Sequence, residues 1–160
     1  MSGESLLVRG FGIVAGVSDV SVVDSMRVDG SGPALVMLHG GPGLSDYMAL
    51  LDGETVGWRR VFYQQRGLSP SPVEGPFTVA RHLADLRSVL DAAGVERAVL
   101  LGHSWGTHLG LQAALVMPDR VAALVLVDPF GIVDDGGAVA LAEALNERLL
   151  PENRARAAEV

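Results

Sequence analysis

The stretch Val99–Gly106, which reads Val-Leu-Leu-Gly-His-Ser-Trp-Gly, restricts the fold of this 160-residue chain more than any other. It overlaps an apolar run, Ala98–Leu101, and is followed by a run of small, helix-compatible residues, Thr107–Val116. The expected order is strand, sharp turn and helix, with Ser104 at the apex. A glycine stands two residues to either side of Ser104, where a Cβ atom would collide in so tight a turn.

A serine at the apex of a strained strand-to-helix turn is the pattern of a nucleophile elbow, which lifts the hydroxyl clear of the sheet. The alternative is a chance Gly-x-Ser-x-Gly loop, which is common in a chain with 20 glycines. The apolar strand before the serine and the helix after it favour the elbow.

The rest of the chain predicts strands that alternate with helices. A continuous apolar run at 34–38 is typical of a strand buried on both faces. Thr78 is suited to cap a helix whose apolar residues recur every three or four positions, and Gly94 is suited to end it. Such alternation predicts an α/β fold, with a mostly parallel sheet and helices on both faces. The expected strands are 6–17, 20–28, 34–38, 58–63, 98–101 and 121–127, and the expected helices are 44–51, 78–93, 107–116 and 138–150.

Composition excludes several classes of function. A formal net charge of −7 argues against binding to a phosphate backbone, and the absence of cysteine excludes thiol nucleophiles, disulfides and thiolate metal sites. No apolar run approaches the ~20 residues of a membrane span, and the N-terminus lacks the pattern of a signal peptide. We therefore expect no nucleic acid, membrane, metal or organic cofactor as a partner, and a cytoplasmic location. A Gly-x-Gly-x-x-Ala match at 10–15 opens no helix and is read as accidental.

A second glycine-rich segment, His39–Gly43, follows the apolar strand at 34–38 and reads His-Gly-Gly-Pro-Gly. Its glycines allow backbone N–H groups to approach a ligand closely. A plain turn is the alternative, which the presence of the elbow makes less favourable.

Three motifs in this order, His39–Gly43, Gln65–Gly67 and Gly102–Gly106, resemble those of the α/β-hydrolase superfamily. More narrowly, they resemble the proline iminopeptidase-like branch, peptidase family S33, and the likeness covers 34–129. The branch usually carries Asp-Gln-Arg-Gly where this chain has Gln64-Gln-Arg-Gly. The resemblance implies an α/β-hydrolase core that lacks its last strands, with residues 1–130 as the N-terminal part of the core and 131–160 as the start of a cap.

The resemblance also implies roles for particular residues. Ser104 would be the nucleophile, and the Trp105 N–H would be one donor of an oxyanion hole. The second donor would come from Gly41, with Gly40 beside it. Asp128 follows a strand where some members place the triad acid, although a turn carboxylate before Pro129 is the preferred reading. Arg66 is expected to form a structural ion pair or backbone hydrogen bonds rather than a substrate contact.

No histidine stands where the superfamily places its base, because none occurs after Leu109. The four histidines, His39, His82, His103 and His108, are each expected to serve packing or hydrogen bonding. His82 is expected on the flank of its helix, and the His103 side chain is expected to point away from the serine.

These observations predict a serine hydrolase that acts on an ester or amide, peptidase-like or aminopeptidase-like, through an acyl-enzyme at Ser104. The machinery would be incomplete in this chain, whose substrate would be a small molecule or peptide. Two alternatives stay open: a shortened, non-catalytic binding or regulatory relic, and one half of a two-chain assembly or self-association through the 121–127 strand edge.

Overall fold

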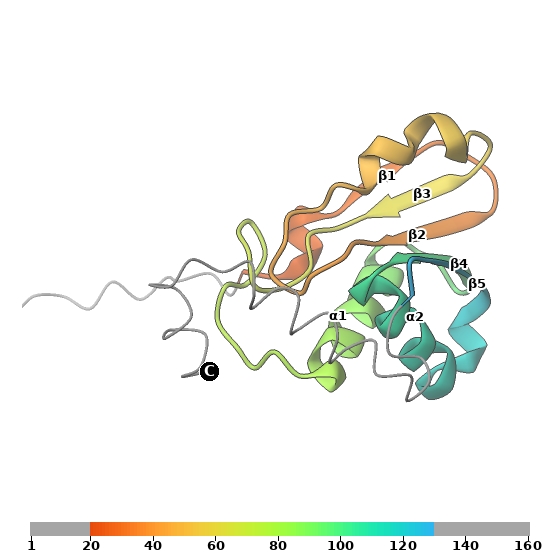
Figure 1. Cartoon of the computed structure of the whole chain (residues 1–160). Coiled ribbons are helices and arrows are strands. Elements are labelled where there is room, and N and C mark those ends of the chain that lie inside the picture. The colour runs from red at the N-terminus through yellow and green to blue at the C-terminus, as the bar shows by residue number, and fades with distance from the viewer. Residues whose placement is uncertain (1–19, 130–160) are drawn as a thin grey trace, which may run out of the picture.

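A computed structural model describes residues 20–129, which form a five-stranded sheet with helices on its two faces (Figure 1). The strand order is β1-β3-β2-β4-β5; β1 runs antiparallel to β3, and the other pairs are parallel. The predicted mostly parallel α/β sheet is thus confirmed. The strands are β1 (Arg27–Asp29), β2 (Ala34–Leu38), β3 (Arg59–Phe62), β4 (Ala98–His103) and β5 (Val121–Val127).

Two α-helices, α1 (Val79–Ala92) and α2 (Trp105–Val116), cover one face of the sheet, where Leu86 and Leu109 are fully buried (Figure 1). The 3₁₀ helix η2 (Met48–Thr55) covers part of the other face. Its Met48 packs with alternate residues of β2 and with Phe62 of β3. Two more 3₁₀ turns, η1 (Val22–Ser25) and η3 (Pro118–Arg120), connect the remaining elements.

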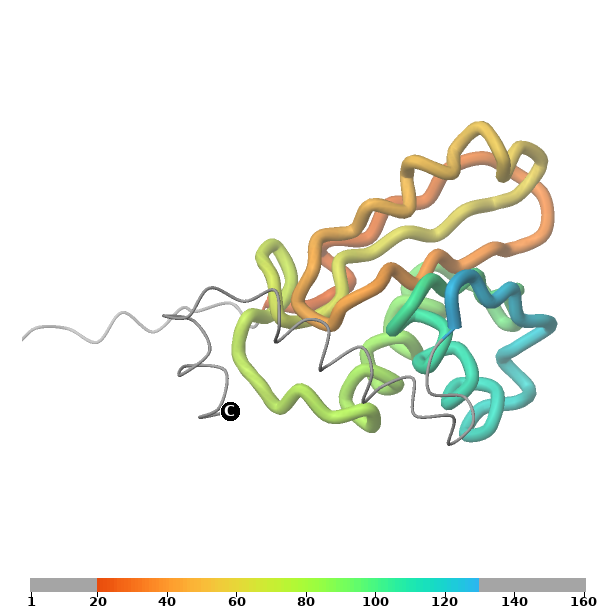
Figure 2. Tube along the Cα trace, in the orientation of Figure 1, coloured from red at the N-terminus to blue at the C-terminus, as the bar shows by residue number. Residues whose placement is uncertain are grey.

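The central strand β2 lies between β3 and β4, as the traces in Figure 2 show. Because it is covered on both faces, its residues from Leu35 to Leu38 are all buried, as the continuous apolar run predicts. Leu38 pairs in register with Gly102 of β4, so both strands end at the same edge of the sheet. The loops that follow them, which carry the two glycine-rich motifs, therefore leave the sheet side by side.

The structure corrects two predicted elements. Residues 20–28 were expected to form a strand, but they begin with η1, because the Ser21 and Asp24 side chains form a reciprocal capping box. The helix expected at 44–51 is a 3₁₀ helix that begins at Met48 instead. The expected strand at 6–17, the expected helix at 138–150, the cap at 131–160 and the domain boundary at 130 lie outside the described residues.

Helix α1 has the predicted cap and the predicted stop. The Thr78 hydroxyl accepts a hydrogen bond from the Arg81 N–H, and Gly94 follows with φ 62°. Two of its polar side chains, Asp85 and His82, are buried, although His82 was expected on the flank of the helix. Burial lowers the pKa of His82, against the raising effect of the nearby Asp85 carboxylate.

A buried ion pair explains Asp85. Its two carboxylate oxygens accept from Nε and Nη2 of Arg66, at 2.5 Å and 2.9 Å, and both side chains are almost fully buried. The pair joins α1 to the loop after β3. This confirms the structural ion pair expected of Arg66.

We predict that Asp85→Asn lowers the free energy of unfolding by about 3–5 kcal/mol, because it leaves a buried guanidinium without its counter-charge. The matched control is Asp91→Asn on the same helix, whose exposed carboxylate pairs with Arg120 and should contribute less than about 1 kcal/mol. Urea denaturation followed by circular dichroism measures both values. Equal losses in the two variants would contradict the assignment.

Candidate active site

The turn between β4 and α2 has the strained geometry that the sequence predicts. Ser104 adopts φ 52° and ψ −117°, a conformation that a residue with a side chain rarely takes. Its N–H donates to the Val127 carbonyl at 3.0 Å, which fastens the turn to the end of β5. The serine is partly exposed at the edge of the sheet.

Both flanking glycines are required by close backbone approaches. A Cβ atom at Gly102 would overlap the carbonyl group of Gly106, across the turn. A Cβ atom at Gly106 would overlap the carbonyl oxygen of Leu38, at the end of β2. The elbow can therefore sit against β2 only because these positions carry no side chain.

Two backbone N–H groups are candidate oxyanion donors, one at the start of α2 and one in the loop after β2. Trp105 is the first residue of α2, so its N–H has no acceptor within the helix. Gly41 adopts φ 141° in the loop after β2, which favours glycine, and its N–H is bonded to no acceptor among residues 20–129. The neighbouring Gly40 N–H donates to the Tyr47 hydroxyl at 2.9 Å.

One hydrogen-bonded network joins the three motifs. The Gln65 side chain donates to the His39 carbonyl at 2.7 Å and accepts from the Trp105 indole N–H at 2.9 Å. The Gln65 N–H also donates to His39 Nε2 at 2.9 Å. The imidazole proton must then be on Nδ1, which donates to the Gly40 carbonyl at 2.7 Å. The network fixes the loop after β2 against the elbow.

Burial lowers the pKa of His39, although its bond to Gly40 and the charge of Asp46 oppose this effect. A neutral ring suits its position, because it must accept at one nitrogen and donate at the other. His39 is thus a structural histidine, as expected.

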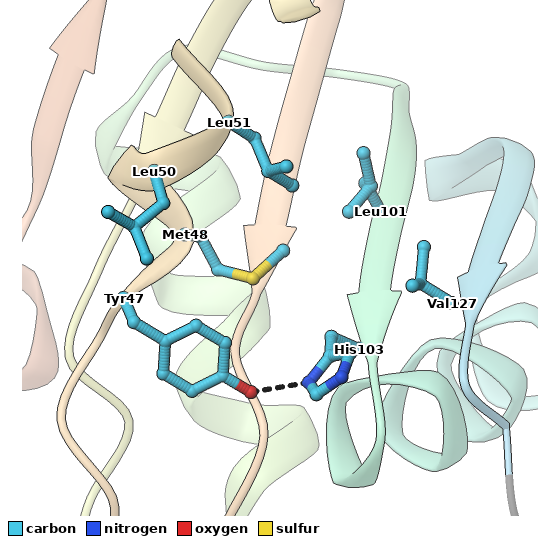
Figure 3. A pocket seen from close by; sticks show the side chains of 7 residues that line it. All are labelled: Tyr47, Met48, Leu50, Leu51, Leu101, His103 and Val127. Carbon is cyan, nitrogen blue, oxygen red and sulfur yellow. Dashed lines mark hydrogen bonds between the residues drawn. The ribbon is translucent and has the colours of Figure 1, made fainter.

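None of the remaining histidines hydrogen-bonds to the serine hydroxyl in the part of the chain that the structure describes. His82 meets the Trp105 ring edge-on, with 5.4 Å between centroids, and His108 stacks on the same ring. The Nδ1 atom of His103 bonds to the Tyr47 hydroxyl at 2.5 Å (Figure 3). The expectation that the His103 side chain points away from the serine stays a prediction.

The Asp128 carboxylate is exposed at the end of β5, and its Oδ2 lies 3.8 Å from His103 Nε2. Asp128 itself adopts φ 52°. The strand ends beside the elbow, so the structure brings Asp128 and Ser104 to the same edge of the sheet.

A small apolar cavity of about 180 Å³ opens between η2 and the ends of β4 and β5 (Figure 3). Tyr47 and His103 form the polar part of its wall, on the side of the elbow. The other lining residues are Met48, Leu50, Leu51, Leu101 and Val127.

Gln64, which stands where the resembling branch has Asp, braces the same loop. Its side chain donates to the Leu44 carbonyl at 2.8 Å and accepts from the Asp46 N–H at 2.9 Å. An amide makes both bonds at once, whereas a carboxylate has no hydrogen to donate. This residue holds the segment that leads from Gly43 to Tyr47.

Sequence reasoning missed Tyr47 and the bridging role of Gln65. Gln65 belongs to the Gln65–Gly67 motif, so the sequence indicated that the position matters but not which groups it bonds to. Tyr47 carried no signal, because its contacts with Gly40 and His103 depend on a loop path that periodicity does not reveal.

Among residues 20–129, no group of three metal-ligating side chains comes together. No helix in that range has the length and apolar character needed to cross a membrane.

Comparison with curated proteins gives relatives that are hydrolases by name. The chain is 37% identical over 101 residues to epoxide hydrolase 2 of Siraitia grosvenorii, which covers 60% of this chain and 32% of that protein. It is 32% identical over 140 residues to the protein designated carbamate hydrolase RutD of Escherichia coli, which covers 74% of this chain and 52% of that protein. The chain thus spans about a third to a half of the length of these relatives.

Among solved structures, a proline iminopeptidase-related protein from Thermus thermophilus is 34% identical, with a TM-score of 0.59 over 65% of this chain and 40% of that one. A hydrolase from Pseudomonas aeruginosa is 32% identical, with a TM-score of 0.61 over 78% of this chain and 48% of that one. The model of the alpha/beta hydrolase fold family matches residues 33–157. The serine turn, the glycine loop beside it and this match agree, and the chain belongs to the alpha/beta hydrolase fold family.

Proposed function

We propose that this chain provides the nucleophile and the oxyanion site of a serine hydrolase that acts on an ester or amide carbonyl. The observation that supports the proposal is the strained Ser104 turn at the start of α2, next to the glycine loop that follows β2. Backbone donors at such a point stabilise the negative charge that develops on a carbonyl oxygen under attack.

In the proposed reaction, Ser104 Oγ attacks the carbonyl carbon, and its proton passes to a base. The tetrahedral oxyanion accepts from the Gly41 and Trp105 N–H groups, and its collapse expels the alcohol or amine and leaves an acyl-serine. Water then hydrolyses the acyl-serine. Gly41 is preferred to Gly40 as the donor, because the Gly40 N–H is already bonded to Tyr47.

The base is proposed to come from outside the four histidines of this sequence. His39 and His82 are buried, His103 is bonded to Tyr47, and His108 stacks on Trp105. A histidine from another segment or chain would have to approach the exposed edge that holds Ser104 and Asp128. The exposed Asp128 carboxylate is our candidate for orienting that imidazole.

The substrate class is also a proposal. The relatives in the comparison act, by their names, on epoxides and carbamates, and one neighbour is related to proline iminopeptidases. A serine hydroxyl beside two backbone amides favours carbonyl substrates, because their reaction develops an oxyanion. Peptidase or aminopeptidase specificity is a narrower form of the same proposal, as is a cytoplasmic location for the enzyme.

We predict that a fluorophosphonate probe labels Ser104 when this sequence is expressed in its full natural reading frame. Ser104→Ala should abolish labelling, because the probe bonds to the activated hydroxyl. Mass spectrometry of the labelled peptide identifies the site. Absence of label on Ser104 would reject the enzyme and favour a shortened hydrolase that binds without turnover.

Gly106→Ala is expected to reduce the labelling rate at least about 100-fold, because its methyl group would displace the elbow from the Leu38 carbonyl and misplace the hydroxyl. The control is Gly110→Ala on the same helix, where a Cβ atom would make ordinary contacts of 3.5 and 3.6 Å with two leucine side chains. Gly110→Ala should label at the wild-type rate. Equal rates in both variants would refute the role of the close approach.

A second candidate function rests on β5, which is an edge strand of the described sheet. Its Val125 and Val127 side chains are 44% and 43% exposed. An edge of this kind can pair with a further strand, from a second copy or from a complementing chain. Light scattering at high concentration tests this assembly, and a monomer would count against it.

A further inference from the structure

We propose that Tyr47 is a positioning residue for the oxyanion site, and that it acts by holding the Gly40–Gly41 segment through its hydroxyl. The inference rests on the proposed serine hydrolase function. It assigns a role to a side chain that lies outside the three sequence motifs.

The Tyr47 hydroxyl lies at the glycine loop, next to the proposed donor. It accepts from the Gly40 N–H at 2.9 Å, on the residue that precedes the proposed donor Gly41. The same glycine is close to the elbow, since a Cβ atom at Gly40 would be 3.4 Å from Ser104 Cβ. The Tyr47 hydroxyl therefore contacts the one stretch of loop that lies directly against the nucleophile.

A second hydrogen bond, to His103, fixes the position of the Tyr47 hydroxyl. The hydroxyl bonds to Nδ1 of His103, the residue before the serine, and His103 Nε2 faces the Asp128 carboxylate at 3.8 Å. With the imidazole proton on Nε2, toward that carboxylate, Nδ1 accepts from the hydroxyl. Tyr47 thus links the loop after β2 to β4 through one oxygen that accepts on one side and donates on the other (Figure 3).

The Tyr47 hydroxyl also occupies the Gly40 N–H, which is the alternative oxyanion donor in this loop. Gly40 and Gly41 present two successive N–H groups, and a loop free to rotate could direct either of them toward the substrate. Because the Gly40 N–H is bonded to Tyr47, the Gly41 N–H is the one of these two that is left to join the Trp105 N–H at the oxyanion. The Tyr47 ring is partly buried and packs against the apolar cluster that contains Met48.

The chain contains two tyrosines, and the second supplies a matched control. Tyr63 is 1% exposed, and its hydroxyl has no hydrogen-bond partner among residues 20–129. Tyr63→Phe therefore removes a buried hydroxyl without breaking a bond, whereas Tyr47→Phe removes one that makes two. Both variants keep the aromatic ring.

The experiment measures the rate of fluorophosphonate labelling at Ser104 in the full natural protein, as a function of probe concentration. Tyr47→Phe should lower the limiting rate constant about tenfold or more, because the donor loses its fixed position. The concentration for half-maximal rate should stay near the wild-type value, and the melting temperature should fall by a few degrees because the Gly40 N–H loses its acceptor. Tyr63→Phe should match the wild type in all three measurements.

Two results would overturn the inference while leaving the proposed function intact: a Tyr47→Phe variant that labels at the wild-type rate, and an equal slowing in Tyr63→Phe. A wild-type protein that does not label would reject both proposals together. If Tyr47→Phe fails to fold, His103→Gln tests the same link from its other end. That variant should slow labelling severalfold, and an unchanged rate would refute the role of Tyr47.

Discussion

The contact between Gly106 and the Leu38 carbonyl is the constraint on which the rest of the site depends. It brings the start of α2 against the end of β2 more closely than any side chain at Gly106 would allow. In the sheet, Leu38 at the end of β2 pairs with Gly102 near the end of β4, so the two strands end at the same edge. As a result, the glycine loop and the serine turn share one edge, and the strain at Ser104 is maintained by packing around it.

Polar side chains then hold these backbone segments in place. Gln65 bridges His39 and Trp105, and Gln64 braces the segment that leads to Tyr47. Such buried groups favour one arrangement strongly, because a missing partner leaves a desolvated donor or acceptor. A neutral His39, whose pKa burial lowers, fits this network because only one of its nitrogens carries a hydrogen.

The regular elements could be predicted from sequence wherever one local signal dominates. The apolar run of β2, the periodicity and caps of α1, and the spacing of glycines around Ser104 each predict their structure directly. The sequence pattern did not predict the burial of Asp85, which lies off the apolar stripe of α1. That burial is accompanied by an ion pair with Arg66, 19 residues away, which local periodicity does not encode. Tyr47 was missed for a similar reason, because its bond to His103 joins residues 56 positions apart and its bond to Gly40 depends on the path of an irregular loop.

The central claim is that the Gly41 and Trp105 N–H groups together stabilise an oxyanion at Ser104. The most direct measurement is a crystal structure of the full natural protein after reaction with a phosphonate, whose tetrahedral phosphorus mimics the intermediate. The claim predicts a phosphoryl oxygen about 2.7–3.1 Å from both nitrogens, with phosphorus bonded to Ser104 Oγ. A phosphoryl oxygen directed to solvent, or toward other donors, would contradict it.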